Sequence, residues 1–305
     1  MVKKYFYYIV LCFLPGILTT GHTQEVGIGQ WRDHLPYRSA ISVASDGNKV
    51  FAATPSSLFY FNKNDLSINK LNRISGLNDI GISKIAFNKS LNALLIAYSN
   101  TNIDLIRGNV IINMPDILTS NAITPERKVI HHILFVDKYA YLSCGFGIVV
   151  IDMEREEVAD TYYIGPGGSS MVVYGLTHND AHFYAATESG IYVASMDDPN
   201  LAYFESWSKD FSLPSPDAIY NHIAYNAGTL FVNKYSDLWA ADSIFIYRNN
   251  EWSYDGEIFN NNNKVFGLKA VNNVLYAVQR YSVYGFDAGL NLEKLIWTYF
   301  TAPCY

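Results

Sequence analysis

The sequence predicts an all-β fold made from one repeated four-stranded unit. In residues 183–193, β-branched and aromatic residues flank a Glu-Ser-Gly corner, as in two strands joined by a tight turn. Related segments recur, and the first aromatic residue or leucine of each stands at 51, 95, 141, 184, 231 and 276. A spacing this regular is typical of a repeat architecture. Four short strands in roughly 45 residues is the pattern of a β-propeller blade.

The first unit shows its four strands in order. Residues 41–44 alternate as a first strand, and Asp46-Gly47-Asn48 forms a hairpin turn. Residues 50–54 and 58–61 are the next two expected strands, and residues 68–71 are a more polar fourth. The unit is therefore a complete blade.

The later units repeat the turn of the first hairpin. Asparagine, aspartate and glycine recur there because they tolerate the positive φ that tight hairpin turns require. These turns stand at residues 88–92, 137–138, 179–180, 226–228 and 272–273. We therefore expect one propeller domain at 24–305, with blades at approximately 40–80, 81–130, 131–172, 173–221, 222–266 and 267–305.

Tryptophans mark the end of several units. Trp207, Trp252 and Trp297 are spaced evenly and each is expected on an outermost strand, whereas Trp31 precedes the first unit. In many propellers an N-terminal strand completes the last blade, yet all six units have a fourth strand of their own. We therefore expect a truncated ring of seven blades, in a chain that is a fragment of a longer protein. A closed six-bladed ring with Trp31 packed elsewhere is the alternative.

The N-terminus predicts a secretory signal peptide at residues 1–23. Lys3 and Lys4 form a short basic region, residues 5–18 are apolar, and small residues follow at 19–23. The apolar run is too short to span a bilayer comfortably. No small residues stand just ahead of Cys12, which argues against a lipoprotein. We expect an exported protein with no transmembrane segment in the mature chain.

The composition favours a large apolar core and argues against nucleic-acid binding. Of the 305 residues, 50% are hydrophobic and 15% aromatic, whereas only 16% are charged. The formal net charge is −6, and no basic block is present to attract nucleic acid or an anionic membrane.

No motif predicts catalysis, a metal site or a cofactor. His131 and His132 are adjacent, so alternation along a strand points them to opposite faces. His178 and His182 flank an expected hairpin turn that could bring their imidazoles across from each other. A metal site needs further ligands, and the turn itself explains the residues between them. We expect no catalytic, cofactor-binding or metal-binding residues, and the protein is not expected to be an enzyme.

Three other segments have structural explanations. The acidic run at 152–157 lacks the spacing of a calcium loop and is expected to be a solvated turn. The glycines at 165–168 lack the lysine and the following helix of a phosphate loop. Cys144 is expected to be a small buried residue, and Cys144 with Cys304 does not make a disulfide framework.

The aromatic residues have two explanations. Most of the 24 tyrosines occupy expected strand positions, where packing between blades accounts for them. Tyr235, Trp239 and Tyr281 stand in expected loops and could stack on sugars or on a protein partner. The sequence does not define which residues bind.

Three segments resemble a known family. Residues 29–37 (Gly-Gln-Trp-Arg-Asp-His-Leu-Pro-Tyr), 50–54 (Val-Phe-Ala-Ala-Thr) and 75–83 (Ser-Gly-Leu-Asn-Asp-Ile-Gly-Ile-Ser) are similar to the N-terminal propeller of PorZ-type proteins of the Bacteroidetes type IX secretion system. The Gly-Leu-Asn-Asp element also resembles two-component regulator propellers, which are periplasmic sensor domains. The resemblance covers residues 29–305 and is strongest over 29–90.

The resemblance implies a function. PorZ-type proteins carry two seven-bladed propellers and a sorting domain, and act at the cell surface in a complex that attaches secreted proteins to lipopolysaccharide. This implies a non-enzymatic scaffold or recognition propeller in the periplasm or on the outer-membrane surface of a Gram-negative bacterium. Its expected partners are proteins of the complex and a surface glycan. The alternative is a periplasmic ligand-sensing propeller of a two-component regulator.

Overall fold

The structure, a computed structural model, describes residues 35–237, 242–254 and 264–297. All described strands belong to the unit Pro36–Tyr305. The helices of the described residues are single turns. None of them has the length and apolar character that a membrane crossing requires.

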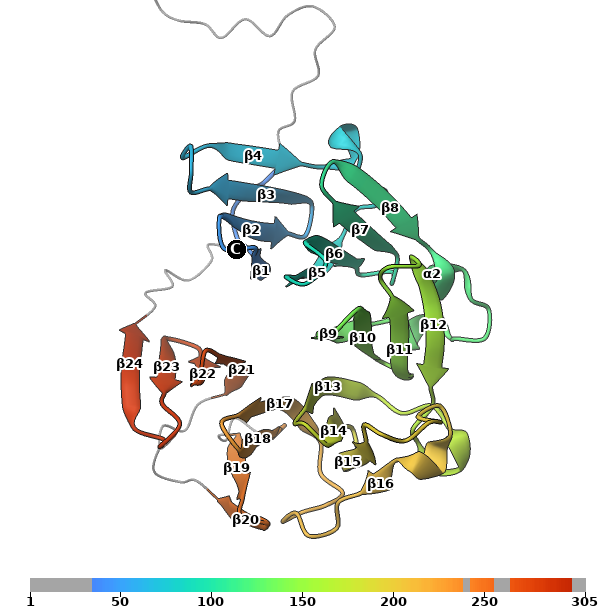
Figure 1. The fold of residues 1–305 in the computed structure, drawn as a ribbon, viewed down its shortest axis with the longest axis vertical. Coiled ribbons are helices and arrows are strands. Elements are labelled where there is room, and N and C mark those ends of the chain that lie inside the picture. The colour runs from blue at the N-terminus through green and yellow to red at the C-terminus, as the bar shows by residue number, and fades with distance from the viewer. Residues whose placement is uncertain (1–34, 238–241, 255–263, 298–305) are drawn as a thin grey trace, which may run out of the picture. The chain divides into compact units, whose positions relative to one another are not determined.

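The described residues form six antiparallel sheets of four strands, arranged as a six-bladed β-propeller (Figure 1). Within each sheet the strands follow one another in chain order, from an innermost strand near the middle of the ring to an outermost strand. The predicted fold class and the six predicted repeats are confirmed.

The strand bounds are as follows. Blades 1 and 2 contain β1 (Ser42–Ser45), β2 (Lys49–Thr54), β3 (Ser57–Asn62), β4 (Ile68–Leu71), β5 (Ile82–Asn88), β6 (Ala93–Tyr98), β7 (Ile103–Arg107) and β8 (Val110–Met114). Blades 3 and 4 contain β9 (Ile130–Val136), β10 (Tyr139–Cys144), β11 (Gly147–Asp152), β12 (Glu157–Tyr162), β13 (Val173–His178), β14 (His182–Thr187), β15 (Gly190–Ser195) and β16 (Ser208–Lys209). Blades 5 and 6 contain β17 (Tyr220–Asn226), β18 (Thr229–Lys234), β19 (Ser243–Arg248), β20 (Glu251–Tyr254), β21 (Val265–Val271), β22 (Val274–Gln279), β23 (Ser282–Phe286) and β24 (Leu292–Trp297).

The first hairpin of most blades turns on residues with positive φ. Gly47 has a φ of 105° and Asp137 a φ of 50°, as the turn residues predict. Blade 4 differs, because neither residue of its turn has positive φ. There the Asn179 side chain accepts hydrogen bonds from the backbone N–H groups of Ala181 and His182, at 2.9 and 2.7 Å. A side-chain hydrogen bond thus replaces the unusual backbone conformation.

The hydrophobic core is divided into five clusters, each between two neighbouring blades. Successive residues of a strand point to opposite faces, so one strand contributes to two clusters. On β10, Leu142 belongs to the cluster between blades 2 and 3, and Tyr141 to the cluster between blades 3 and 4. The blades between two others are therefore apolar on both faces, which explains the continuous hydrophobic runs of their central strands.

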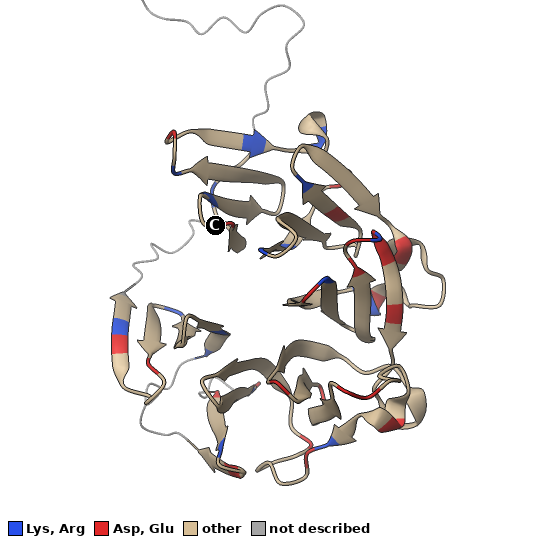
Figure 2. Cartoon of the chain, in the orientation of Figure 1, with Lys and Arg blue, Asp and Glu red and all other residues tan. Residues whose placement is uncertain are grey.

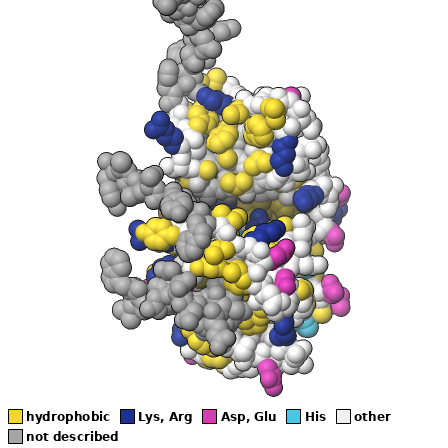
Figure 3. All heavy atoms as spheres, turned by 90° about the vertical axis from the view of Figure 1, so that its left-hand side faces the viewer, with side chains coloured by type: hydrophobic (Ala, Val, Ile, Leu, Met, Phe, Trp, Pro, Cys, Tyr) yellow, Lys and Arg dark blue, Asp and Glu magenta, His cyan; other side chains and the backbone are white. Residues whose placement is uncertain are grey.

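Blades 1 and 6 are each packed on one neighbour. The five clusters join blade 1 to blade 2 and so on to blade 6, and none of them joins described residues of blades 6 and 1. Figure 3 views the side on which these two blades lie, where exposed hydrophobic side chains gather. The exposed hydrophobic side chains of these two blades include Ile41, Val43, Ile68, Tyr281 and Ile296.

The tryptophans follow the prediction with one difference. Trp252 and Trp297 lie on the outermost strands β20 and β24, whereas Trp207 stands one residue before β16. Trp31 lies outside the described residues, so its place in a seventh blade and the truncated ring both stay predictions.

Candidate functional site

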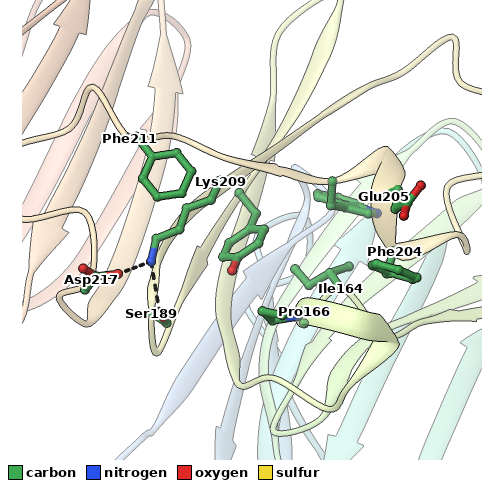
Figure 4. A pocket seen from close by; sticks show the side chains of 11 residues that line it. Ile164, Pro166, Ser189, Phe204, Glu205, Lys209, Phe211 and Asp217 are labelled. Carbon is green, nitrogen blue, oxygen red and sulfur yellow. Dashed lines mark hydrogen bonds and ion pairs between the residues drawn. The ribbon is translucent and has the colours of Figure 1, made fainter.

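A pocket of about 540 Å³ lies beside the outermost strand of blade 4 (Figure 4). It is formed by the segment after β12, by β15 and β16, and by the loop that leads to blade 5. Its apolar side chains are Ile164, Pro166, Tyr192, Phe204, Trp207 and Phe211, and its polar side chains are Ser189, Glu205, Lys209 and Asp217. The size and the mainly apolar lining fit a site for a small molecule or a side chain of a partner.

The pocket exists because blade 4 has a longer connection between its third and fourth strands than the other described blades. Residues 196–207 join β15 to β16, whereas the longest of the other connections are residues 63–67 and 287–291. The long connection contains the single turn η5 (Phe204–Ser206), which contacts the turn η4 (Pro166–Gly168). An insertion in one blade therefore closes the pocket against the preceding segment.

Trp207 forms a fixed wall of the pocket. It is buried, and its indole N–H donates a hydrogen bond to the carbonyl oxygen of Leu201 at 2.9 Å. Its ring packs on the rings of Tyr162 and Phe183, both at 6.4 Å between centroids. Phe211 is 75% exposed, with the Lys209 ammonium 5.7 Å from its ring centroid. The exposed Phe211 ring provides a surface on which a flat apolar group can stack.

Lys209 links the apolar wall to a polar edge. Its side chain is 11% exposed, and its ammonium forms an ion pair with Asp217 and donates a hydrogen bond to Ser189 Oγ at 3.3 Å (Figure 4). The Asp217 side chain is 85% exposed. Because one partner is so exposed, this pair contributes little to stability. The exposed Asp217 carboxylate can accept hydrogen bonds from a hydroxyl or amino group of a ligand.

The arrangement is suited to binding. Lys209 links the Ser189 hydroxyl to the Asp217 carboxylate at the polar edge of the pocket. Within the part of the chain that the structure describes, no three His, Cys, Asp or Glu residues lie close enough to hold a metal ion. The side chains of the pocket offer a ligand stacking, hydrogen bonding and ion pairing.

The two adjacent histidines are not arranged as strict alternation predicts. His131 is the extra residue of a β-bulge in β9, so the alternation of faces is interrupted there. The ring of His131 packs on Tyr174, at 5.0 Å between centroids. Burial and the charge of Lys84 lower the pKa values of His131 and His132 to about 4.

The hypothesis that His178 and His182 face each other is wrong. The register pairs His178 with Phe183, so His182 lies on the opposite face of the hairpin. The His178 ring contacts Phe183 at 6.0 Å, and the His182 ring contacts Tyr184 at 6.2 Å. Both imidazoles are packed beside aromatic rings.

The acidic run forms the predicted turn between β11 and β12, but its first residue is buried and not solvated as predicted. The Asp152 carboxylate accepts a hydrogen bond from the Lys138 ammonium at 2.8 Å, and others from the backbone N–H groups of Glu154 and Arg155. The hydrogen bond from Lys138 lowers the pKa of Asp152. The Asp152 carboxylate therefore stabilises the turn that it begins, by accepting hydrogen bonds from the backbone of that turn.

The glycine segment at 165–168 and the aromatic residues of the expected loops differ in whether they belong to the pocket. Gly165 and Pro166 line the pocket, so the glycine segment is a wall of the candidate site. Tyr235 and Tyr281 lie outside the pocket, and each has a cation near its ring: Lys264 at 4.6 Å and Arg280 at 5.4 Å. Trp239 lies outside the described residues.

The structure describes Cys144 but not Cys304. Cys144 is fully buried, and burial raises the pKa of its thiol, so it is a small core residue as predicted. Cys304 lies outside the described residues.

The sequence did not predict Phe204, Lys209 and Phe211 as site residues. They come from the long connection, from β16 and from the following loop, and only packing brings them together. The one signal in the sequence is the unusual length of residues 196–207.

Comparison with known proteins agrees with the fold. A family model described as the N-terminal β-propeller domain of PorZ of the type IX secretion system matches residues 50–208, more than half of the chain. The structure of PorZ from Porphyromonas gingivalis, described as an essential surface component of that system, superposes with a TM-score of 0.70 at 19% identity. The match covers 84% of this chain and 32% of that one, so the chain spans about a third of the length of PorZ.

A second solved structure shares the architecture alone. The β-propeller domain of Cps50 (Swd1) from Myceliophteria thermophila has a TM-score of 0.55 at 11% identity, over 79% of this chain and 80% of that one. No curated protein matches the sequence.

Proposed function

Because the chain belongs to the family of PorZ N-terminal β-propeller domains of the type IX secretion system, we propose that it is a non-enzymatic recognition propeller of that machinery. The pocket on blade 4 is the observation that carries this proposal. Its fixed indole and exposed phenylalanine fit an apolar side chain or a sugar face, and its ion pair fits a polar group beside it. Protein partners of the complex are the proposed ligands, with a surface glycan as a further one.

The proposed location is the periplasm or the outer-membrane surface. Residues 1–23 supply the export signal in this proposal, and residues 24–305 the propeller domain. Two observations support it: the basic and apolar pattern of the N-terminus, and the surface location stated for PorZ of Porphyromonas gingivalis.

A photo-crosslinking amino acid tests the binding role of the pocket. It replaces Phe211 in the full chain, expressed in its native bacterium, and the adducts are identified by mass spectrometry. We expect adducts with a component of the secretion complex. The matched control places the same amino acid at Leu66, which is 73% exposed against 75% for Phe211 but lies on blade 1. Equal adducts at both positions, or none at Phe211, contradict the proposal.

A periplasmic ligand-sensing propeller is the second candidate. The volume of the pocket, about 540 Å³, lies in the range of small-molecule sites and favours this alternative. Native mass spectrometry of the protein purified from the periplasm separates the two. A bound small molecule that the Phe211→Ala variant no longer retains supports the sensor, and a protein adduct at Phe211 supports the secretion role.

A further inference from the structure

Blade 4, which carries the pocket, holds the net negative charge of the protein. Residues 173–219, from β13 to the loop before β17, contain seven acidic residues and one basic residue, Lys209. The formal charge of this segment equals the −6 of the whole chain, so the other residues are together formally neutral. Figure 2 shows acidic residues along the turns and loops of this blade and a basic one on β16. Four of the acidic residues are exposed: Asp180, Asp197, Glu205 and Asp217.

Most of these carboxylates have no cation beside them. In the part of the chain that the structure describes, only two of the seven take part in an ion pair. Arg127 pairs with Glu188 at 3.6 Å, and Lys209 pairs with Asp217. Glu205, in the single turn η5, has no cation within ion-pair distance among the described residues. Blade 4 therefore presents negative charge that no neighbouring lysine or arginine offsets.

Two of the exposed carboxylates belong to the pocket. Asp217 and Glu205 both line it, and Figure 4 shows them at opposite sides of the lining. Lys209 is the one basic side chain of the lining, and its ammonium is turned towards Asp217 and Ser189. Because the Lys209 side chain is only 11% exposed and that of Asp217 is 85% exposed, the charges that an incoming ligand meets are mainly the carboxylates.

Tyr192 adds a polar group without a partner. The register pairs Tyr192 of β15 with Lys209 of β16, so their side chains lie side by side on one face of the blade. Tyr192 is 6% exposed and lines the pocket, yet its hydroxyl has no hydrogen bond to another described residue. Burial raises the pKa of Tyr192, so the hydroxyl stays protonated and can both donate and accept a hydrogen bond. Since polar groups of buried side chains are usually paired, this hydroxyl is available to a ligand in the pocket.

We propose that the pocket on blade 4 docks a positively charged segment of a protein partner. An apolar side chain of the segment lies against the rings of the pocket, and its lysine or arginine side chains lie beside Asp217 and Glu205. The inference rests on the recognition function proposed for this pocket, because it names the chemistry of the protein that the pocket recognises.

The arrangement of charge and apolar surface favours a basic segment over a single cation. Two carboxylates at opposite sides of one mainly apolar pocket fit a segment that has more than one basic side chain. A basic side chain can also lie over the exposed ring of Phe211. The negative charge of the whole blade attracts a positive segment from a distance and repels an acidic one, so it contributes to both the rate and the specificity of docking.

The segment that crosslinks to position 211 tests the inference. The full chain with the photo-crosslinking amino acid in place of Phe211 is expressed in its native bacterium, and mass spectrometry sequences the attached peptide of the partner. We expect more lysine and arginine than aspartate and glutamate around the attachment point. An attached segment that is neutral or acidic overturns this inference and leaves the proposed function standing. The absence of adducts at position 211 contradicts both.

Two pairs of substitutions separate the pocket from the general charge of the blade. Glu205→Gln with Asp217→Asn leaves Lys209 as the only charge of the lining, so we expect the yield of adducts to fall about tenfold. Asp180→Asn with Asp197→Asn is the matched control, because it removes the same charge from exposed positions of blade 4 outside the pocket, and it should lower the yield less than about twofold. All four side chains are exposed, so both variants are expected to fold. Equal yields in the two variants overturn docking in the pocket.

Discussion

The Gly-Leu-Asn-Asp element at residues 76–79 connects blades 1 and 2, and Asn78 of this element is hydrogen-bonded to Asp104 of blade 2. Its buried carboxylate accepts four hydrogen bonds: from the backbone N–H and the side-chain amide of Asn78, from the Tyr98 hydroxyl and from the Asn113 amide, at 2.5 to 2.9 Å. Burial and the hydrogen bond to Asp104 raise the pKa of Tyr98, so its hydroxyl stays a donor. Asp79 extends the network by accepting from the Asn100 amide at 2.7 Å. The element is therefore a structural joint.

We expect Asp104→Ala to lower the free energy of unfolding by roughly 3 kcal/mol or more, because buried donors lose their acceptor. Urea unfolding of the variant measures this loss. Asp180→Ala, at an exposed turn position, is the matched control and should change stability by less than about 0.5 kcal/mol. Equal stability of the Asp104 variant and the wild type contradicts the role of the network.

Gly190 is needed for both its conformation and its size. Its φ is 99°, and a Cβ there would lie 2.1 Å from the carbonyl oxygen of Pro216. Gly108 has a φ of 59°, but nothing lies within 4 Å of its would-be Cβ. We expect Gly190→Ala to destabilise by roughly 2 kcal/mol or more, and Gly108→Ala by about 1 kcal/mol, since only the first adds a clash. Thermal unfolding measures both, and equal losses mean that the contact with Pro216 adds nothing.

At the scale of the element, the innermost strands make stability depend on pH. The pKa of His132 is lowered from the ordinary value of about 6.5 to about 4 in the folded state. Between these values the unfolded chain binds more protons, so stability is lost as the pH falls from about 6.5 to about 4. Above about 6.5 the imidazole is neutral in both states and contributes nothing.

We expect His132→Gln to reduce the slope of stability against pH by up to about 1.4 kcal/mol per pH unit between pH 6.5 and 5. Urea unfolding in phosphate-free buffer at several pH values measures the slope. The exposed His182 serves as the control, and His182→Gln should leave the slope unchanged. A His132 variant with the wild-type slope contradicts the lowered pKa.

At the scale of the whole molecule, the blades differ in how much of them is covered. Every residue of β11 in blade 3 is buried, and on β10 only Tyr139 is partly exposed. On β22 in blade 6 buried and half-buried residues alternate, because one face packs on blade 5 and the other has no described cluster against it. Local stability follows the number of buried contacts.

We expect the amide hydrogens of β10 and β11 to exchange more slowly than those of β22 and β23. All four are central strands with hydrogen-bonded neighbours on both sides, so the comparison isolates the packing of the faces. Hydrogen–deuterium exchange with peptide-level mass spectrometry measures the difference. Equal protection means that another surface covers the open face of blade 6 in solution.

The sequence by itself determined the repeat, the strands and most of the turns. A hairpin is a local structure, so alternation of residues and one or two turn residues are enough to specify it, as at Asp46-Gly47. The predicted boundaries between units are accurate for several blades. The expected unit starts at 131, 222 and 267 lie within one or two residues of the first residues of β9, β17 and β21.

Only the tertiary structure decided which side chains form the pocket on blade 4. Phe211 and Trp207 line one pocket because the long connection of blade 4 folds back, and the His131 ring packs on Tyr174 because blades 3 and 4 are neighbours. Contacts between residues far apart in sequence depend on how whole blades pack, and no local pattern records that packing. The bulge at His131 shows the same limit, because one extra residue in a strand changes which side chains share a face.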